Sequence, residues 1–233
     1  MNERLSRPLI HTFLEAPMSG PEIELKSFEI IDRETPAHPF PPNEWQIVRR
    51  MIHTTGDFSV SKTVRFSRDA VAAGIRALQS CRTIYTDANM IRSGISLNRL
   101  KGVCGSYRRE NIICHVADAD VENLAKGTGL PRSLLAIRKA KSHLEGAIVV
   151  IGNAPVALME LSRLIVEEGL HPSLVIAMPV GFVHVTESKE ELMELDVPYI
   201  ATVGRRGGSP LAVTVIHALC GLAIQEKDPG RSV

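Results

Sequence analysis

AIVVIGNAPVALMELSRLIVEEG, at residues 147–169, contains a complete strand–loop–helix pattern. Its first five residues are apolar and mostly β-branched, which predicts a strand that is buried on both faces. From Ala154 onward, apolar side chains recur at helical spacing as far as Glu168, and Gly169 then supplies a C-terminal cap. A buried strand followed closely by a helix is a βα unit, the building block of a parallel sheet.

The pattern of a short apolar run followed by a helix occurs elsewhere along the chain. We expect five strands, at residues 83–86, 111–116, 147–151, 174–178 and 199–203. We expect helices at 68–80, around Met90 and Ile91, and at 120–126, 131–143, 154–168, 188–195 and 209–222, with Ser188 as a cap. Right-handed crossovers then give an α/β fold of three layers, doubly wound around a five-stranded parallel sheet.

Two extra helices are expected before the first strand. Residues 21–34 place apolar side chains among charges after a proline that suits a helix start, and Asn43 is expected to cap a helix ending near residue 55. The Pro-rich segment TPAHPFPPN at 35–43 connects the two helices. Because no repeat or clear boundary is present, we predict a single domain over residues 1–233, with the N-terminal helices packed on the sheet.

The composition argues against nucleic-acid and membrane partners. Lys and Arg number 27 against 26 Asp and Glu, so no global field attracts nucleic acid or an anionic membrane, and 4% aromatic residues are too few for a base-stacking platform. The start of the chain, MNERLSRP, has no apolar signal-peptide region, and the apolar stretches 174–185 and 211–224 are interrupted and short for a bilayer. We therefore expect a soluble, cytoplasmic protein.

Cysteine and histidine spacing does not indicate a metal site. The four cysteines form no CxxC pair and fit no zinc ribbon, so buried free thiols in a reducing compartment are expected. His115 and His217 lie in apolar runs and are expected to be core residues, whereas His184 follows the fourth strand and could line a pocket. Because no HxH or HxxxH pair occurs, we expect no catalytic metal.

We expect the ligand-binding and catalytic residues in the loops after the strands, because ligands of open α/β sheets bind outside the carboxyl ends of the strands. These loops hold many of the small and special residues of the chain. Together they describe a pocket with close backbone approach, helix N-termini and arginines. The candidate residues in these loops are Asp87, Asn89, Asn153, Arg205, Arg206, Gly207, Gly208 and Ser209.

The segment GRRGGSP at 204–210 is the strongest local signal. Its glycines let the backbone approach a ligand, the N–H groups of the next helix favour an anion, and the two arginines add charge. The alternative is a solvated turn before a helix. Neither GxxxxGK[ST] nor GxGxxG occurs, which disfavours a nucleotide-binding dehydrogenase.

Arg132 follows Pro131 at the start of a helix, where the macrodipole disfavours a cation. An anionic ligand shared with the helix N–H groups would explain this arginine. The alternative is an exposed arginine held by a nearby acid, which costs little.

His53 lies near the end of the helix that is expected to begin at Asn43. At about 100° per residue, one face of that helix carries Ile47, Val48, Met51 and Ile52. His53 falls well off this stripe, so it faces solvent, a ligand or a second subunit. Its place in the last turn favours the imidazolium form, which suits a proton donor. An idle surface histidine is the alternative.

Five motifs occur in an order that resembles one known family. They are IHTTGDF at 52–58, DANMIRSGI at 87–95, IGNAPVAL at 151–158, MPVGFVHVTESK at 178–189 and RRGGS at 205–209. Together they look like the precorrin-8X methylmutase family, which includes the cobalt-precorrin-8 methylmutases of the anaerobic pathway. The resemblance runs from about residue 21 to residue 222.

The resemblance implies a flavodoxin-like five-stranded parallel sheet and a homodimer with active sites at or near the subunit interface. It implies an isomerase of cobalamin biosynthesis that moves a methyl group from C-11 to C-12 of precorrin-8X, giving hydrogenobyrinic acid, or of its cobalt counterpart, giving cobyrinic acid. The family's catalytic histidine falls on His53, a substrate-contacting arginine on Arg132, and a serine near the substrate on Ser27.

This chemistry suits the residues. A large apolar ring rimmed with carboxylates needs a broad pocket, arginines and helix N-termini. The rearrangement needs no redox cofactor or methyl donor, and any cobalt would be carried by the tetrapyrrole substrate. A corrinoid carrier without catalysis is the main rival hypothesis, and the intact IHTTGD segment argues against it. A flavin or nucleotide binder is a third, disfavoured by the missing phosphate-binding motif.

Overall fold

The structure is a computed structural model that describes residues 16–35 and 37–228 of the 233-residue chain. The chain divides into two compact units, one ending at His38 and the other beginning at Pro39. This division falls inside the Pro-rich connector, at a place where the sequence suggested no boundary. The single domain therefore stays a prediction, and the two units are described separately.

The N-terminal unit contains helix α2 (Gly20–Glu34), which matches the helix expected at 21–34. Ser19 caps it with a capping box: the Glu22 N–H donates to Ser19 Oγ, and the Glu22 carboxylate accepts from the Ser19 N–H at 2.7 Å. This reciprocal pair satisfies two N–H groups that a helix start leaves open.

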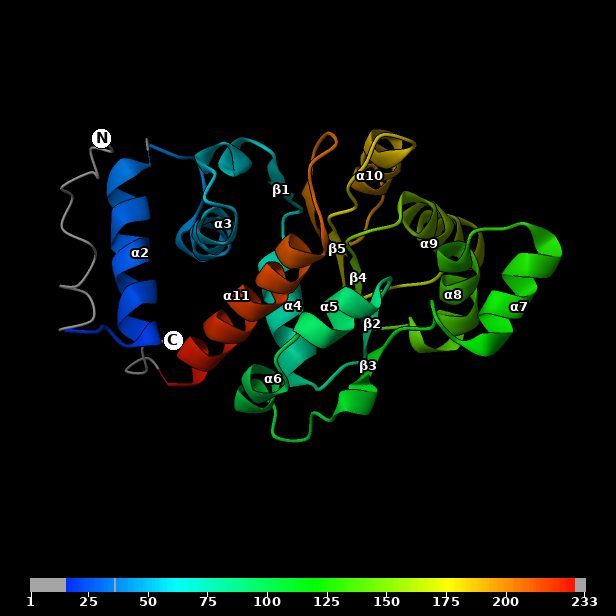
Figure 1. The fold of residues 1–233 in the computed structure, drawn as a ribbon, viewed down its shortest axis with the longest axis horizontal. Coiled ribbons are helices and arrows are strands. Elements are labelled where there is room, and N and C mark those ends of the chain that lie inside the picture. The colour runs from blue at the N-terminus through cyan, green and yellow to red at the C-terminus, as the bar shows by residue number, and fades with distance from the viewer. Residues whose placement is uncertain (1–15, 36, 229–233) are drawn as a thin grey trace, which may run out of the picture. The chain divides into compact units, whose positions relative to one another are not determined.

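A sheet of six strands forms the centre of the second unit, in the order β1-β6-β5-β4-β2-β3 (Figure 1). Five strands are parallel, as expected: β2 (Ile84–Thr86), β3 (Ile112–Ile113), β4 (Ile148–Ile151), β5 (Leu174–Ala177) and β6 (Tyr199–Thr202). Every residue of β4 and β5 is buried, because helices cover both faces. The expected count of five strands was wrong, since β1 (Val64–Phe66) joins β6 as an antiparallel edge strand.

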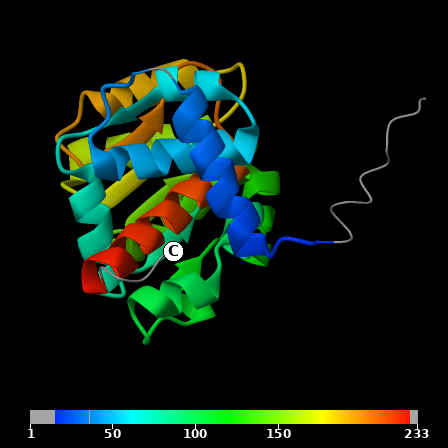
Figure 2. The same ribbon diagram turned by 90° about the vertical axis from the view of Figure 1, so that its left-hand side faces the viewer.

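Helices lie on both faces of the sheet (Figures 1 and 2). On one face α9 (Pro155–Glu168) and α10 (Val185–Met193) contact the strands, and α8 (Arg132–Ala140) packs on α9 with α7 (Ala119–Thr128) beside it. On the other face α4 (Ala70–Gln79), α5 (Asn89–Gly94) and α11 (Ser209–Lys227) contact the strands, and α3 (Pro42–Thr55) and α6 (Leu97–Val103) pack on α11. The expected three layers are therefore present.

Two of the expected helix caps were wrong. Asn43 lies inside α3, whose N-cap is Pro41, because Pro42 already supplies the backbone angle of the first helical position. Ser188 lies inside α10, and its hydroxyl donates to the Val185 carbonyl at 3.0 Å. The N-cap of α10 is His184, which has a left-handed backbone with φ of 59°.

Helix α11 continues to Lys227, five residues beyond the expected end at 222. It is long and apolar enough to cross a membrane by length and composition, although 67% of its most apolar stretch is buried inside the fold. Such burial is typical of the central helix of a packed layer. The apolar stretch 211–224 lies inside this longer helix, so the length of the helix was underestimated from the sequence.

The expectation of four free cysteines was also wrong, because Cys81 and Cys104 form a disulfide with 5.9 Å between their Cα atoms. The bond joins the segment after α4 to the end of α6. Helix α6 was not anticipated from the sequence, so the proximity of these two residues was not visible either. Cys114 and Cys220 are free thiols, and Cys220 is buried.

Candidate active site

The order of the parallel strands reverses between β2 and β4, because β3 lies outside β2 while β5 and β6 follow β4 on the other side. Ligands of open α/β sheets bind at such a switch point, outside the carboxyl ends of the strands. Here Asp87 occupies the switch point with its side chain buried. Its carboxylate accepts the N–H groups of Gly152 at 2.9 Å and Ala154 at 2.6 Å. A third bond comes from the Asn153 N–H, also at 2.9 Å.

Asp87 therefore binds the loop that leads into α9, whose first residue is Pro155. Burial raises the pKa of this carboxyl group, and the three N–H bonds act in the opposite direction. Both carboxylate oxygens already have protein partners, so Asp87 holds the loop after β4 in place. Asn153, in that loop, is exposed at the carboxyl edge of the sheet, as is Asn89 at the start of α5.

Asp87→Asn should lower the free energy of unfolding by about 2 kcal/mol or more, because an amide cannot accept three N–H groups and turns its own N–H donors toward them. Urea denaturation at neutral pH measures the effect. Asp196→Asn, at an exposed site after α10, is the matched control. Equal denaturation midpoints for the two variants would contradict the role of Asp87 in holding this loop.

Helix α3 presents His53 as the sequence predicted. Ile47, Val48, Met51 and Ile52 are buried, and His53 is exposed in the last turn. The end of this helix is attached to α11 of the same unit, because Thr54 Oγ1 lies 2.8 Å from Thr214 Oγ1.

A second attachment joins the end of α3 to the loop after β6. We call residues 204–208 the arginine loop. Arg206 Nη1 donates to Asp57 Oδ2 at 2.5 Å and to Ser59 Oγ at 2.6 Å. Hydrogen bonds from Ser59, and then Arg206, lower the pKa of Asp57. Because Asp57 lies four residues beyond His53, this contact brings the predicted acid–base residue and the predicted anion-binding loop to one region of the carboxyl edge.

The arginine loop packs against the loop that follows β5. The Gly208 N–H donates to the Met178 carbonyl at 2.7 Å. At Gly207 a Cβ atom would lie 2.2 Å from the Met178 oxygen and 2.5 Å from the Pro179 oxygen, so only glycine fits. Ser209 begins α11 and is buried.

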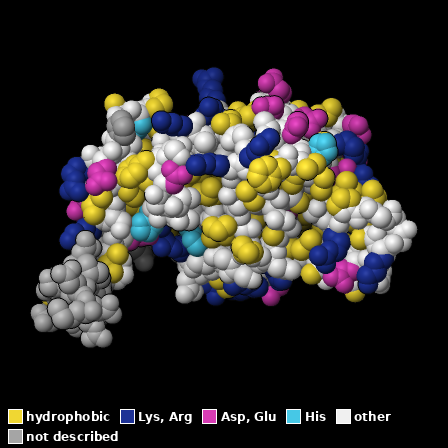
Figure 3. All heavy atoms as spheres, turned by 45° about the horizontal axis from the view of Figure 1, so that its top comes forward, with side chains coloured by type: hydrophobic (Ala, Val, Ile, Leu, Met, Phe, Trp, Pro, Cys, Tyr) yellow, Lys and Arg dark blue, Asp and Glu magenta, His cyan; other side chains and the backbone are white. Residues whose placement is uncertain are grey.

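Apolar side chains are exposed beside this loop. Val180, Phe182 and Val183 follow β5, and Phe182 is 81% exposed. The Arg205 guanidinium lies 5.3 Å from the centre of the Phe182 ring, a cation–π contact. Figure 3 turns the carboxyl edge toward the viewer and shows hydrophobic side chains across the middle of the face, with Lys and Arg side chains among them. An exposed apolar patch with arginines suits a flat apolar ligand that carries carboxylates.

Two other predicted site residues, Arg132 and Ser27, are already bonded to protein groups near them in sequence or structure. Arg132 begins α8 and pairs with Glu122 of α7 at 2.9 Å, which is the local acid of the alternative interpretation. Ser27 belongs to the N-terminal unit, where its hydroxyl donates to the Ile23 carbonyl at 2.8 Å. Their roles as substrate contacts stay predictions.

Three other histidines considered in the sequence, His115, His217 and His184, are described by the structure. His115 contacts Asp118 at 2.8 Å, and the His217 ring accepts the Ser96 N–H at 3.0 Å. Both are only partly buried, so the expectation of core residues is met in part. His184 is exposed at the start of α10. Within residues 16–35 and 37–228, no three His, Cys, Asp or Glu side chains form a group that could hold a metal ion.

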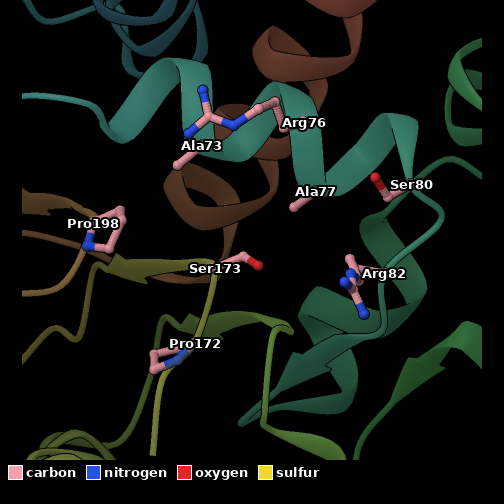
Figure 4. A pocket seen from close by; sticks show the side chains of 8 residues that line it. All are labelled: Ala73, Arg76, Ala77, Ser80, Arg82, Pro172, Ser173 and Pro198. Atoms are coloured by element: carbon pink, nitrogen blue, oxygen red, sulfur yellow. The ribbon is translucent and has the colours of Figure 1, made fainter.

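One cavity of about 270 Å³ lies at the opposite edge of the sheet (Figure 4). It is lined by residues of α4, among them Arg76, and by residues one or two positions before strands, among them Arg82, Ser173 and Pro198. Ligand pockets for drug-sized molecules usually hold ~300 Å³ or more, and a macrocycle needs the upper part of that range. The exposed patch at the carboxyl edge is therefore the better candidate for a large ring.

Two residues of this region, Asp57 and Lys189, were not singled out from the sequence, although they lie inside the motifs IHTTGDF and MPVGFVHVTESK. The partner of Asp57 could not be predicted, because Arg206 lies 149 residues away. Lys189 did give a signal: the buried positions of α10 are 185, 188, 189 and 192, so a lysine occupies the apolar face of a helix.

A sequence model described as precorrin-8X methylmutase matches residues 22–222. The cobalt-precorrin-8 methylmutase of Leptospira interrogans is 43% identical over 209 residues, which cover 86% of this chain and 92% of the relative. The chain belongs to the precorrin-8X methylmutase family. The precorrin-8X methylmutase of Pseudomonas aeruginosa is 38% identical, covering 86% of this chain and 94% of the relative.

The family also accounts for the fold. The crystal structure of the Thermus thermophilus precorrin-8X methylmutase superimposes with a TM-score of 0.81 at 44% identity, covering 89% of this chain and 98% of the other. Methylmutases of this family are isomerases that transfer a methyl group within one molecule. His53, the Asp57–Arg206 pair and the arginine loop all lie inside the matched residues 22–222.

Proposed function

We propose that this protein is an isomerase of cobalamin biosynthesis that moves a methyl group from C-11 to C-12 of precorrin-8X or cobalt-precorrin-8. Membership of the methylmutase family carries the proposal. The carboxyl edge supports it, because an exposed histidine, an apolar patch and an arginine loop occur there together.

In this proposal His53 is the general acid and base. It gives a proton to the bound ring, the methyl group migrates between adjacent carbons, and the proton is then returned, so no group is gained or lost. The protein contributes orientation of the ring and proton transfer. No methyl donor and no redox cofactor are needed, and any cobalt arrives within the substrate.

The proposed site residues fall into two groups, according to whether other protein groups already bind them. Arg206 and Asp87 are engaged by other protein groups, so they position the loops. Arg205, the Gly207 N–H group and the start of α11 at Ser209 are the proposed contacts for ring carboxylates. Gly208 positions the loop, because its N–H is already bonded to the Met178 carbonyl. Asn89, Asn153, Arg132 and Ser27 are further proposed contacts.

We also propose a flavodoxin-like fold, a homodimer with active sites near the interface, and a cytoplasmic location. The five parallel strands, numbered in chain order, lie in the order 2-1-3-4-5, which is the flavodoxin order. The exposure of Phe182 and Val183 supports a dimer, because large apolar side chains near a site are commonly covered by a ligand or a second subunit.

Incubation with precorrin-8X, followed by visible absorbance, tests the function, and a parallel reaction with cobalt-precorrin-8 identifies the preferred ring. Sustained conversion at catalytic protein concentration supports the isomerase. A spectral shift that stops at one equivalent of protein indicates a carrier instead, and an unchanged spectrum with both rings rejects a corrinoid function. Sedimentation of the same sample reports the dimer.

A further inference from the structure

Lys189 of α10 carries a buried cation with an unusual set of partners. Its side chain is fully buried, and Nζ donates to the carbonyl oxygens of Gly204 at 2.9 Å and Arg206 at 2.7 Å. A third bond goes to Thr202 Oγ1 at 3.1 Å. An ammonium group has three N–H donors, so all of them are used on the end of β6 and the arginine loop.

Burial of the Lys189 ammonium group costs free energy, and packing alone does not explain why a lysine occupies this position. In the part of the chain that the structure describes, no carboxylate pairs with Lys189, and burial lowers the pKa of its ammonium group to about 8. An apolar side chain at the same position of α10 would fill the space without desolvating a charge. The distinctive contribution of the lysine is therefore its bonds to the loop.

Those bonds determine which way the loop presents its N–H groups. In a trans peptide the C=O and the following N–H point in opposite directions, and no described peptide bond is cis. Because the carbonyls of Gly204 and Arg206 point toward Lys189, the N–H groups of Arg205 and Gly207 point away from it. Among the described residues neither N–H has an acceptor. Two open donors and the Arg205 guanidinium thus belong to one short loop.

We propose that Lys189 is a positioning residue for substrate binding, which holds the arginine loop so that the N–H groups of Arg205 and Gly207 receive a carboxylate. The proposal rests on the proposed function for the identity of that carboxylate, a side-chain acid of the tetrapyrrole ring. Thr202 strengthens the same arrangement, because its hydroxyl donates to the Arg206 carbonyl at 2.8 Å. Lys189 itself touches no substrate in this scheme.

Lys189→Met tests the proposal, with Lys126→Met on the exposed surface of α7 as the matched control. Hydrogen exchange of peptides that cover residues 203–208 is measured first, on the free protein. The Gly208 N–H, bonded to the Met178 carbonyl, should exchange at least about 10-fold faster in Lys189→Met, because the loop loses its anchor. The control should match the wild type.

Ring binding and steady-state conversion are then measured on the same samples. Lys189→Met should weaken ring affinity and raise KM by roughly 10-fold or more, with a smaller change in kcat, since a disordered loop binds at an entropic cost. Lys189→Gln, which keeps two N–H donors, should be intermediate, and it replaces Lys189→Met if the latter does not fold.

Three results would overturn the proposal. They are an unchanged loop exchange rate, a faster exchange with unchanged ring affinity, and a fall in kcat alone. The wild type separates this test from that of the function. If the wild type converts no ring, the proposed function fails together with the assigned carboxylate. If it converts the ring and Lys189→Met behaves normally, the positioning role alone fails.

Discussion

His53→Ala should lower the conversion of the ring by about 10²- to 10⁴-fold, the usual contribution of a positioned general acid or base. The side chain is exposed, and the face of α3 that packs against the core does not include it. Removal should therefore change the free energy of unfolding by no more than about 0.5 kcal/mol. Ring affinity should change little, because the apolar patch and the arginine loop remain.

Single-turnover conversion and ring titration of the same preparation measure the two effects separately. His171→Ala, at an exposed site just before β5 and so at the opposite edge of the sheet, is the matched control. If His53→Ala converts the ring at a rate near that of the wild type, the assignment of the acid is wrong. If it loses affinity in proportion to rate, the histidine binds the ring and does not transfer the proton.

Gly207→Ala should disable the site through its backbone. A Cβ atom there would lie 2.2 Å from the Met178 oxygen, so the arginine loop has to move away from the loop after β5. The movement breaks the Gly208 N–H bond to Met178 and shifts Arg206 away from Asp57. We expect a loss of about 3 kcal/mol or more in the free energy of unfolding. Conversion of the ring should fall at least about 100-fold, as misplacement of groups around a reacting centre commonly does.

Urea denaturation measures the change in the free energy of unfolding, and the conversion assay measures the change in rate. Gly105→Ala is the control, because a Cβ atom at Gly105 meets no neighbour within 4 Å. An alanine at 207 that leaves both the denaturation midpoint and the conversion rate unchanged would show that the two loops are not in contact in solution.

Much of the fold was predictable because it depends on local patterns. The five parallel strands each appear in the sequence as a short apolar run, and the expected positions agree with the structure to within a few residues except for β3, which spans only Ile112–Ile113. The off-stripe position of His53 was likewise predictable from helical periodicity. The caps at Asn43 and Ser188 were not, since a neighbouring proline or a left-handed residue can start a helix without them.

The residue types of the candidate site could be predicted from the sequence, but their contacts could be predicted only in part. The loops after the strands were correctly expected to lie at one edge, because parallel strands all end there. Asp87 and Arg206 appeared as candidate ligand contacts, and the structure shows their charged groups bound to other parts of the protein. Lys189 gave a visible pattern, a cation within an apolar stripe, that was not interpreted.

The sequence alone was sufficient for the βα order, for the face on which His53 lies and for the family, because each depends on residues close together in the chain or on short motifs. The structure was needed for the pairing of β1 with β6, for the Cys81–Cys104 bond and for the Asp57–Arg206 contact. Each of these joins residues that are far apart in sequence, and their proximity arises only when the strands and helices pack into one core. The arginine loop depends on both sequence and tertiary structure. Its glycines could be recognised in the sequence, whereas its hydrogen bonds to Lys189 form only in the folded chain.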